Sequence, residues 1–297
     1  MSESTRQADA EGPADIRSAA LDRRRFVMTS LISGFTLATA RAEAEPIHTD
    51  AAGLAAGTVS IPVGGGLEMP AYFARPATGT NLPVVLVNEE IFGIHEYMQD
   101  ICRRLAKQRY LAVAPEIYFR NAEFPHMTDA GQIIREVVMR TPDAQVMGDL
   151  DATLAWAAAN HGDPGRVGVA GFCRGGRNTW LYAAHNPRLK AAVAFYGGLG
   201  GAVSDIQPKT ALDIAGEIQC PLLGLYGGQD GSIPVSDVRA AEARAKAAGK
   251  TVEIVIYPDA GHGFHADYRP SYNCEAAEDG WRRMLAWFGR YGVAPQS

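Results

Sequence analysis

The chain has 297 residues, with 28 Lys and Arg against 33 Asp and Glu, so its formal net charge is −5, and 47% of its residues are hydrophobic. This composition is typical of a globular protein, and it excludes extensive disorder, which requires low hydrophobicity and high charge. Lys and Arg form no extended run after the first 45 residues. We therefore expect no nucleic-acid partner.

Residues 1–44 resemble an export signal of the twin-arginine type. Arg23 and Arg24 precede a weakly apolar stretch over residues 26–40, and small residues in A-x-A order end at Ala44. This stretch of 15 residues is short for a membrane span, which needs about 20. We expect export to the periplasm or the extracellular space, cleavage near Ala44, and no stable membrane association afterwards. The alternative is a chance arginine cluster before an interfacial helix.

After a linker over residues 45–57, the sequence predicts one α/β domain over residues 58–292. Strand-like and helix-like segments alternate, which is typical of the α/β-hydrolase fold class, a mostly parallel, doubly wound sheet flanked by helices. The predicted strands are Thr58–Val63, Leu67–Phe73, Pro83–Val87, Tyr110–Ala114, Arg166–Ala170, Ala191–Tyr196, Leu222–Tyr226 and Thr251–Tyr257. The predicted helices are Glu96–Gln108, Asp143–Asn160, Arg174–His185, Val235–Ala248 and Cys274–Tyr291.

The segment G-F-C-R-G-G at residues 171–176 joins a predicted strand directly to a predicted helix. This is the nucleophile-elbow pattern of α/β-hydrolases, with Cys173 where serine is usual. The turn is so tight that side chains two residues before and two after the nucleophile would collide with backbone, which explains Gly171 and Gly175. A helix that begins at the nucleophile directs its first N–H groups toward the sulfur. The alternative is a buried cysteine in an ordinary glycine-rich turn.

Two further residues, Asp230 and His262, complete the pattern. Asp230 follows the predicted strand Leu222–Tyr226, and His262 follows the next strand. The order nucleophile, acid, histidine is the one that this fold uses, and the spacings fit one or two β/α units. Taken singly, Asp230 could be a turn residue and His262 a polar loop residue. Together with the elbow, they predict a catalytic group.

The loop after strand Pro83–Val87 reads N-E-E-I-F-G. In this fold that loop supplies the second N–H of the oxyanion hole. A pair of acids is unexpected there, because a carboxylate beside a thiolate opposes its formation. Glu90 is therefore either a structural turn residue or a group that handles the thiol proton.

Four segments together resemble the dienelactone hydrolase family, and the resemblance extends from about residue 58 to 290. They are E-I-F-G at 90–93, G-F-C-R-G-G at 171–176, G-G-Q-D at 227–230 and A-G-H-G-F at 260–264.

The resemblance implies roles for individual residues. Cys173 would be the nucleophile, His262 the general base and Asp230 the acid that orients it. Glu90 would contact the resting thiol and take part in activating it when substrate binds. The backbone N–H groups of Ile91 and Arg174 would form the oxyanion hole.

The substrate pocket departs from the pattern of the members that hydrolyse dienelactone. Those enzymes continue after the histidine with S-F-A-R, whose arginine helps to hold the substrate carboxylate, whereas this chain has Ala266 at that position. This departure does not change the predicted hydrolysis, but it puts dienelactone itself in doubt as the substrate. The candidate substrate-binding residues are Phe264, His265 and Arg269, with Arg135 or Arg140 as a second anion anchor.

These observations favour a hydrolase that needs no cofactor or metal and cleaves a lactone or small carboxylic ester through a thioester on Cys173. The alternatives are a cysteine-dependent acyltransferase or thioesterase on the same fold, and a non-catalytic homologue that binds a small molecule. We expect a monomer or a small homo-oligomer. The other cysteines, Cys102, Cys220 and Cys274, form no C-x-x-C pair, so neither a zinc knuckle nor a redox motif is expected.

Overall fold

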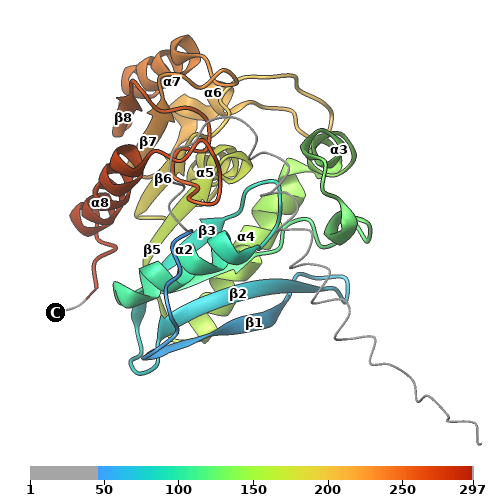
Figure 1. The fold of residues 1–297 in the computed structure, drawn as a ribbon, viewed down its shortest axis with the longest axis vertical. Coiled ribbons are helices and arrows are strands. Elements are labelled where there is room, and N and C mark those ends of the chain that lie inside the picture. Colours follow the sequence, from blue (N-terminus) through green and yellow to red (C-terminus); the bar gives the residue numbers. More distant parts are fainter. Residues whose placement is uncertain (1–45, 296–297) are drawn as a thin grey trace, which may run out of the picture. The chain divides into compact units, whose positions relative to one another are not determined.

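A computed structural model describes residues 46–295, and these residues are built around a single eight-stranded sheet (Figure 1). The strand order is β1-β2-β4-β3-β5-β6-β7-β8. The strands are β1 (Leu54–Pro62), β2 (Glu68–Pro76), β3 (Leu82–Asn88), β4 (Leu111–Pro115), β5 (Gly162–Phe172), β6 (Ala191–Phe195), β7 (Leu222–Gly227) and β8 (Val252–Tyr257). The predicted export signal, residues 1–44, lies outside the described residues.

Strands β3 to β8 run parallel, while β1 and β2 form an antiparallel hairpin whose second strand pairs antiparallel with β4. The helices that connect and flank the strands are α2 (Glu96–Lys107), α3 (Ala130–Glu136), α4 (Asp143–Ala159), α5 (Arg174–His185), α6 (Ala211–Ile214), α7 (Val235–Ala247) and α8 (Cys274–Arg290). Short 3₁₀ helices cover Phe124–His126, Val138–Arg140 and Ala215–Glu217. The predicted fold class, a mostly parallel sheet flanked by helices, is confirmed.

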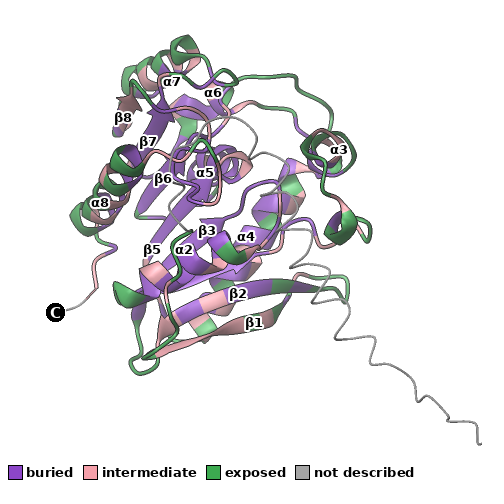
Figure 2. Ribbon diagram, viewed as in Figure 1, coloured by how far each residue is buried: buried purple, intermediate pink, exposed green. Residues whose placement is uncertain are grey.

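The central strands are buried on both faces (Figure 2). Every residue of β3, β4 and β6 is buried, which requires cover on both sides of the sheet and explains why these segments are continuous apolar runs rather than alternating ones. The chain reverses its direction of winding between β3 and β5, which are neighbours in the sheet. In open α/β sheets, ligands bind at the carboxyl ends of the strands at such a switch point. A ligand site is therefore expected at the residues that follow Asn88 and Phe172.

The structure differs from the predicted linker over residues 45–57. Strand β1 begins at Leu54 rather than at the predicted Thr58. The preceding residues are bonded to helix α2: the Thr49 N–H donates to Asp100 Oδ1 at 2.5 Å, and Arg103 donates to the Thr49 carbonyl. The sequence of this segment does not predict its hydrogen bonds to α2, because the partner residues lie about 50 residues further along the chain.

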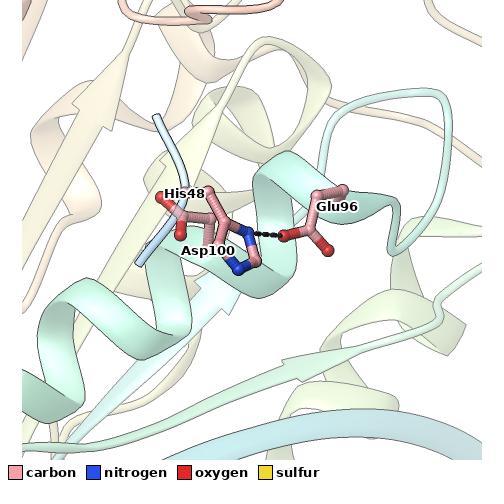
Figure 3. A group of neighbouring side chains, drawn as sticks. All are labelled: His48, Glu96 and Asp100. Carbon is pink, nitrogen blue, oxygen red and sulfur yellow. Dashed lines mark hydrogen bonds and ion pairs between the residues drawn. The ribbon is translucent and has the colours of Figure 1, made fainter. Parts of the chain in front are cut away.

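Asp100 is the centre of that attachment (Figure 3). Its side chain is fully buried and accepts hydrogen bonds from Arg103 and Arg104 as well as from Thr49. Arg104 also pairs with Asp267, so the contact ties the amino-terminal segment to the loop before α8.

Within the described residues, no helix is long and apolar enough to cross a membrane.

We predict that Asp100→Ala will lower the free energy of unfolding by about 3 kcal/mol, because Arg103 and Arg104 each lose one of their two carboxylate partners. Asp50→Ala is the matched control, since Asp50 is exposed and its pair with Lys107 is worth about 1 kcal/mol or less. Denaturant unfolding of both variants measures the difference. Equal losses in the two variants would contradict the central position given to Asp100.

Candidate active site

Cys173 lies at the turn between β5 and α5 with φ 55° and ψ −115°, a conformation that residues with a side chain rarely adopt. The turn is crowded as predicted. A Cβ on Gly171 would lie 2.1 Å from the Gly175 carbonyl oxygen, and one on Gly175 would lie 2.2 Å from the Asn88 carbonyl oxygen. The second contact also places the elbow directly against the loop after β3. Glycine is therefore required at both positions.

The three predicted residues form one hydrogen-bonded chain. Cys173 Sγ lies 3.1 Å from His262 Nε2, and His262 Nδ1 lies 2.7 Å from Asp230 Oδ2. Asp230 follows β7 and His262 follows β8, so each side chain comes from the carboxyl end of a neighbouring parallel strand. The short distance to Asp230 favours the tautomer in which His262 Nδ1 carries the proton and donates it.

The second oxygen of Asp230 is held by the turn that follows it. Asp230 Oδ1 accepts hydrogen bonds from the Ser232 backbone N–H at 2.8 Å and from the Ser232 hydroxyl at 2.6 Å. Burial raises the pKa of Asp230, but the hydrogen bonds from His262 and Ser232 outweigh it, and the pKa lies below its usual value. Sequence reasoning missed Ser232, although an aspartate two residues before a serine is a common turn signal.

The same contacts decide the charge of His262. Burial alone would lower its pKa, but the hydrogen bonds with Asp230 and Cys173 outweigh burial and raise the pKa to about 10. His262 is therefore an imidazolium at neutral pH when its partners are ionised. A positive ring 3.1 Å from Cys173 Sγ is placed to stabilise negative charge on the sulfur during a reaction.

Glu90 is fully buried and forms no hydrogen bond with the Cys173 thiol, so the expected contact with resting Cys173 is wrong for this structure. Its Oε2 accepts hydrogen bonds from the Tyr268 hydroxyl at 2.6 Å and from Arg269 Nη2 at 3.0 Å. Burial raises the pKa of Glu90, but the charge of Arg269 and the surrounding donors lower it to about 2. Glu90 is thus a carboxylate whose charge Arg269 balances.

The two residues expected to supply oxyanion donors lie on adjoining segments, Arg174 at the start of α5 and Ile91 in the loop after β3. Arg174 is the first residue of α5, where a backbone N–H has no partner within the helix. In the turns and loops of residues 46–295, neither the Ile91 nor the Arg174 backbone N–H donates to a backbone carbonyl. Because Gly175 packs against the carbonyl groups of Asn88 and Glu89, these two donors come from segments in direct contact.

Two of the three candidate substrate-binding residues belong to the core, so these predictions are wrong. Phe264 is fully buried and packs its ring against Tyr196 and Tyr257. His265 is buried, and the Tyr97 hydroxyl lies 2.7 Å from its Nδ1. Burial lowers the pKa of His265 to about 3, so the ring is neutral. Their nearness to His262 in sequence was misleading, since the loop turns inward immediately after it.

The third candidate, Arg269, does lie at the site, where its guanidinium pairs with Glu90 and covers the ring of Phe92 at 5.2 Å. Ala266, at the position of the expected arginine, is fully buried. Arg140, a candidate anion anchor, is exposed and lines a cleft of about 400 Å³ together with Tyr118. Arg135 does not line this cleft.

Tyr268 and Tyr196 were missed by sequence reasoning. Tyr268 bonds to Glu90, and the ring of Tyr196 packs against that of His262 with centroids 5.2 Å apart. Only the fold brings these tyrosines to the site, and no local pattern distinguishes them from other aromatic residues.

One group of side chains in the described part of the chain has the types and spacing of a metal site, namely His48, Glu96 and Asp100 (Figure 3). Its carboxylate groups are already bonded to Arg103 and Arg104. A cation would have to displace these guanidinium groups, so the group is better explained as the attachment described above.

Several known proteins are similar to this chain over most of its length. A protein of Methylorubrum extorquens named "Putative carboxymethylenebutenolidase" is 52% identical over 287 residues, which cover 95% of this chain and 98% of the relative. An Escherichia coli K12 protein of the same name is 51% identical over 265 residues, which cover 89% and 97%. The crystal structure of a "Putative Dienelactone Hydrolase" from Klebsiella pneumoniae superposes with a TM-score of 0.78 at 53% identity, covering 80% of this chain and 99% of that chain.

The model of the Dienelactone hydrolase family matches residues 69–292, which include all of the site residues described above. High identity to the relatives extends over nearly their whole length. This chain therefore belongs to the dienelactone hydrolase family and is a hydrolase.

Proposed function

We propose that the protein hydrolyses a lactone or small carboxylic ester, with Cys173 as nucleophile, His262 as proton carrier and Asp230 as the residue that orients His262. The observation that carries the proposal is the continuous chain from Cys173 Sγ through His262 to Asp230, at 3.1 and 2.7 Å. The names of the two relatives refer to a butenolide, which is a lactone, and this supports the substrate class.

In the first half of the reaction, the Cys173 thiolate attacks the carbonyl carbon of the ester or lactone. The carbonyl oxygen becomes an oxyanion, which accepts hydrogen bonds from the backbone N–H groups of Ile91 and Arg174. The bond to the leaving oxygen then breaks, and His262 gives its Nε2 proton to that oxygen. The products are an alcohol group and a thioester on Cys173.

In the second half, neutral His262 takes a proton from a water molecule, and the resulting hydroxide attacks the thioester carbonyl. The same two N–H groups stabilise the second oxyanion. The carbon–sulfur bond breaks, the carboxylic acid leaves, and the Cys173 thiolate and the His262 imidazolium are restored. Every step uses groups of this chain and water, so the proposed reaction requires no cofactor.

We predict that Cys173→Ala and His262→Ala will each lower kcat by at least about 10³, because each removes a member of one catalytic unit. Asp230→Asn should be severe but milder, since His262 loses the acceptor that fixes its tautomer. A panel of lactones and activated esters, with Cys173→Ala as the blank, measures these effects. More than about a tenth of wild-type activity in Cys173→Ala would place the nucleophile elsewhere.

Mass spectrometry with an activated ester from the same panel separates hydrolysis from acyl transfer and from non-catalytic binding. Mass spectrometry after mixing with an activated ester should show a transient acyl group on Cys173. Unchanged decay of this adduct in the presence of an added alcohol supports hydrolysis, whereas capture by the alcohol indicates an acyltransferase. Absence of any adduct on the folded protein favours a non-catalytic binding function.

We further propose that Glu90 takes part in managing the charge of the thiol, because the charges of both Glu90 and Cys173 act on Arg269. We predict that Glu90→Gln will lower kcat by at least about tenfold. Alkylation of Cys173 at one fixed pH should be faster than in the wild type, since Arg269 keeps a positive charge that Glu90 no longer balances. Wild-type turnover combined with wild-type alkylation would leave Glu90 a structural role alone.

We also propose export, on the basis of the sequence of residues 1–44 alone. Changing both Arg23 and Arg24 to lysine should leave a folded precursor in the cytoplasm, because twin-arginine signals require the arginine pair. Cell fractionation of the double variant and of the wild type tests this prediction. Equal amounts of both proteins outside the cytoplasm would show that the arginine pair is not an export signal.

A further inference from the structure

The turn that carries Arg269 makes two ion pairs of opposite sense. The Arg269 backbone N–H donates to the Ala266 carbonyl at 3.0 Å, so Asp267 is one of the two central residues of this turn. Arg269 Nη2 donates to Glu90 Oε2 at 3.0 Å. Asp267 Oδ2 accepts a hydrogen bond from Arg104 Nη2 at 2.5 Å, and this second pair takes no part in the proposed reaction.

Both partners of the turn belong to one continuous stretch of chain. Glu90 lies in the loop after β3, and Arg104 lies on α2, the helix that follows this loop. The side chains of Glu90 and Asp267 are 0% and 3% exposed, and those of Arg104 and Arg269 are 15% and 20% exposed. Removing one member of such a pair leaves the other charge poorly solvated, so the loss has a larger effect than at the surface.

Arg104 offers Asp267 a rigid partner. Its Nε donates to Asp100 Oδ2 at 2.5 Å while its Nη2 donates to Asp267, so two carboxylates hold the guanidinium. Asp100 is fully buried and also accepts hydrogen bonds from the Thr49 N–H and from Arg103. The turn is therefore fastened to a helix residue whose position is fixed by other contacts.

The Glu90–Arg269 pair joins the segments on either side of the nucleophile. Gly263 follows His262 and has φ +74°, and a Cβ at this glycine would lie 3.2 Å from Arg269 Nη1 and 3.3 Å from Arg269 Cδ. The arginine side chain thus lies against the backbone next to His262. The carbonyl oxygen of the residue before Glu90 would lie 2.5 Å from a Cβ on Gly175 in the elbow. The position of Arg269 therefore affects the charge near both segments.

We propose that Asp267 and Arg104 are positioning residues, whose ion pair keeps Arg269 against its carboxylate partner. The negative charge of Glu90 then stays balanced near the nucleophile. This inference rests on the proposed function, in which Cys173 is that nucleophile. When the ion pair is removed, Arg269 is partly exposed and can turn to solvent, whereas Glu90 is fully buried and cannot follow it.

Loss of the ion pair should make the Cys173 thiol less reactive. An unbalanced carboxylate opposes negative charge on the sulfur, so Asp267→Asn should slow alkylation by the neutral reagent iodoacetamide by at least about threefold at one fixed pH. This change is opposite in sign to the one expected for Glu90→Gln. Arg104→Gln should also slow alkylation, because it removes the same pair while Asp100 keeps two other donors. In both variants kcat should fall in parallel.

A matched control and a second background make the test specific. Asp50→Asn removes an exposed ion pair of the same helix and should react at the wild-type rate. In a Glu90→Gln background there is no carboxylate to uncover, so Asp267→Asn should change the rate by less than about 1.5-fold. Mass spectrometry of the peptide that contains Cys173 gives the rates, since Cys274 is also exposed.

Two outcomes overturn the positioning role. One is equal alkylation of the wild type and Asp267→Asn. The other is slowing of the same size in the wild-type and Glu90→Gln backgrounds, which would show a general loosening of the site. Each variant is assayed below its own Tm, and if only one of Asp267→Asn and Arg104→Gln folds, that variant decides.

Alkylation does not require turnover, so this inference and the proposed function fail separately. A folded wild type that cleaves no lactone or ester, and forms no acyl adduct on Cys173, overturns the proposed function. The alkylation rates then still decide whether the ion pair positions Arg269. A wild type that is active through Cys173, with kcat and alkylation unchanged in Asp267→Asn, overturns the positioning role alone.

Discussion

The close packing of backbone at the elbow is the constraint on which the rest of the site depends. Gly171 and Gly175 allow β5, α5 and the loop after β3 to meet within distances that no side chain would permit. The cost is the strained conformation of Cys173, which is of order 1–3 kcal/mol for such positions. The same packing fixes three groups in one place through backbone contacts rather than through flexible side chains. They are the sulfur, the amino terminus of α5 and the Ile91 N–H.

Three buried or partly buried carboxyl groups near the nucleophile differ because their partners differ. Asp230 is ionised because His262 and two groups of Ser232 bond to it. Glu90 is ionised because Arg269 and Tyr268 do the same. Burial, together with the negative charge of Glu116, raises the pKa of Glu89 instead of lowering it. Residue type alone therefore does not decide which acid carries a charge.

Sequence patterns predicted the fold and the hydrogen-bonded chain because both depend on local signals. Continuous apolar runs, the glycines around Cys173 and the positions of Asp230 and His262 after strands are all visible over a few residues. The environment of Glu90 could not be predicted, since Arg269 lies 179 residues away in the chain. The same limit applies to Phe264, whose direction into the core is set by the fold and not by its neighbours.

The structure also explains why two adjacent acids can lie in a loop beside a thiolate, an arrangement that electrostatics would disfavour. Glu90 lies against the loop after β8, where Arg269 balances its charge, and Glu89 accepts a hydrogen bond from the Ile117 backbone N–H in the loop after β4. Glu90 then adds no uncompensated charge beside Cys173, while both side chains help to fasten the loop on which Ile91 lies.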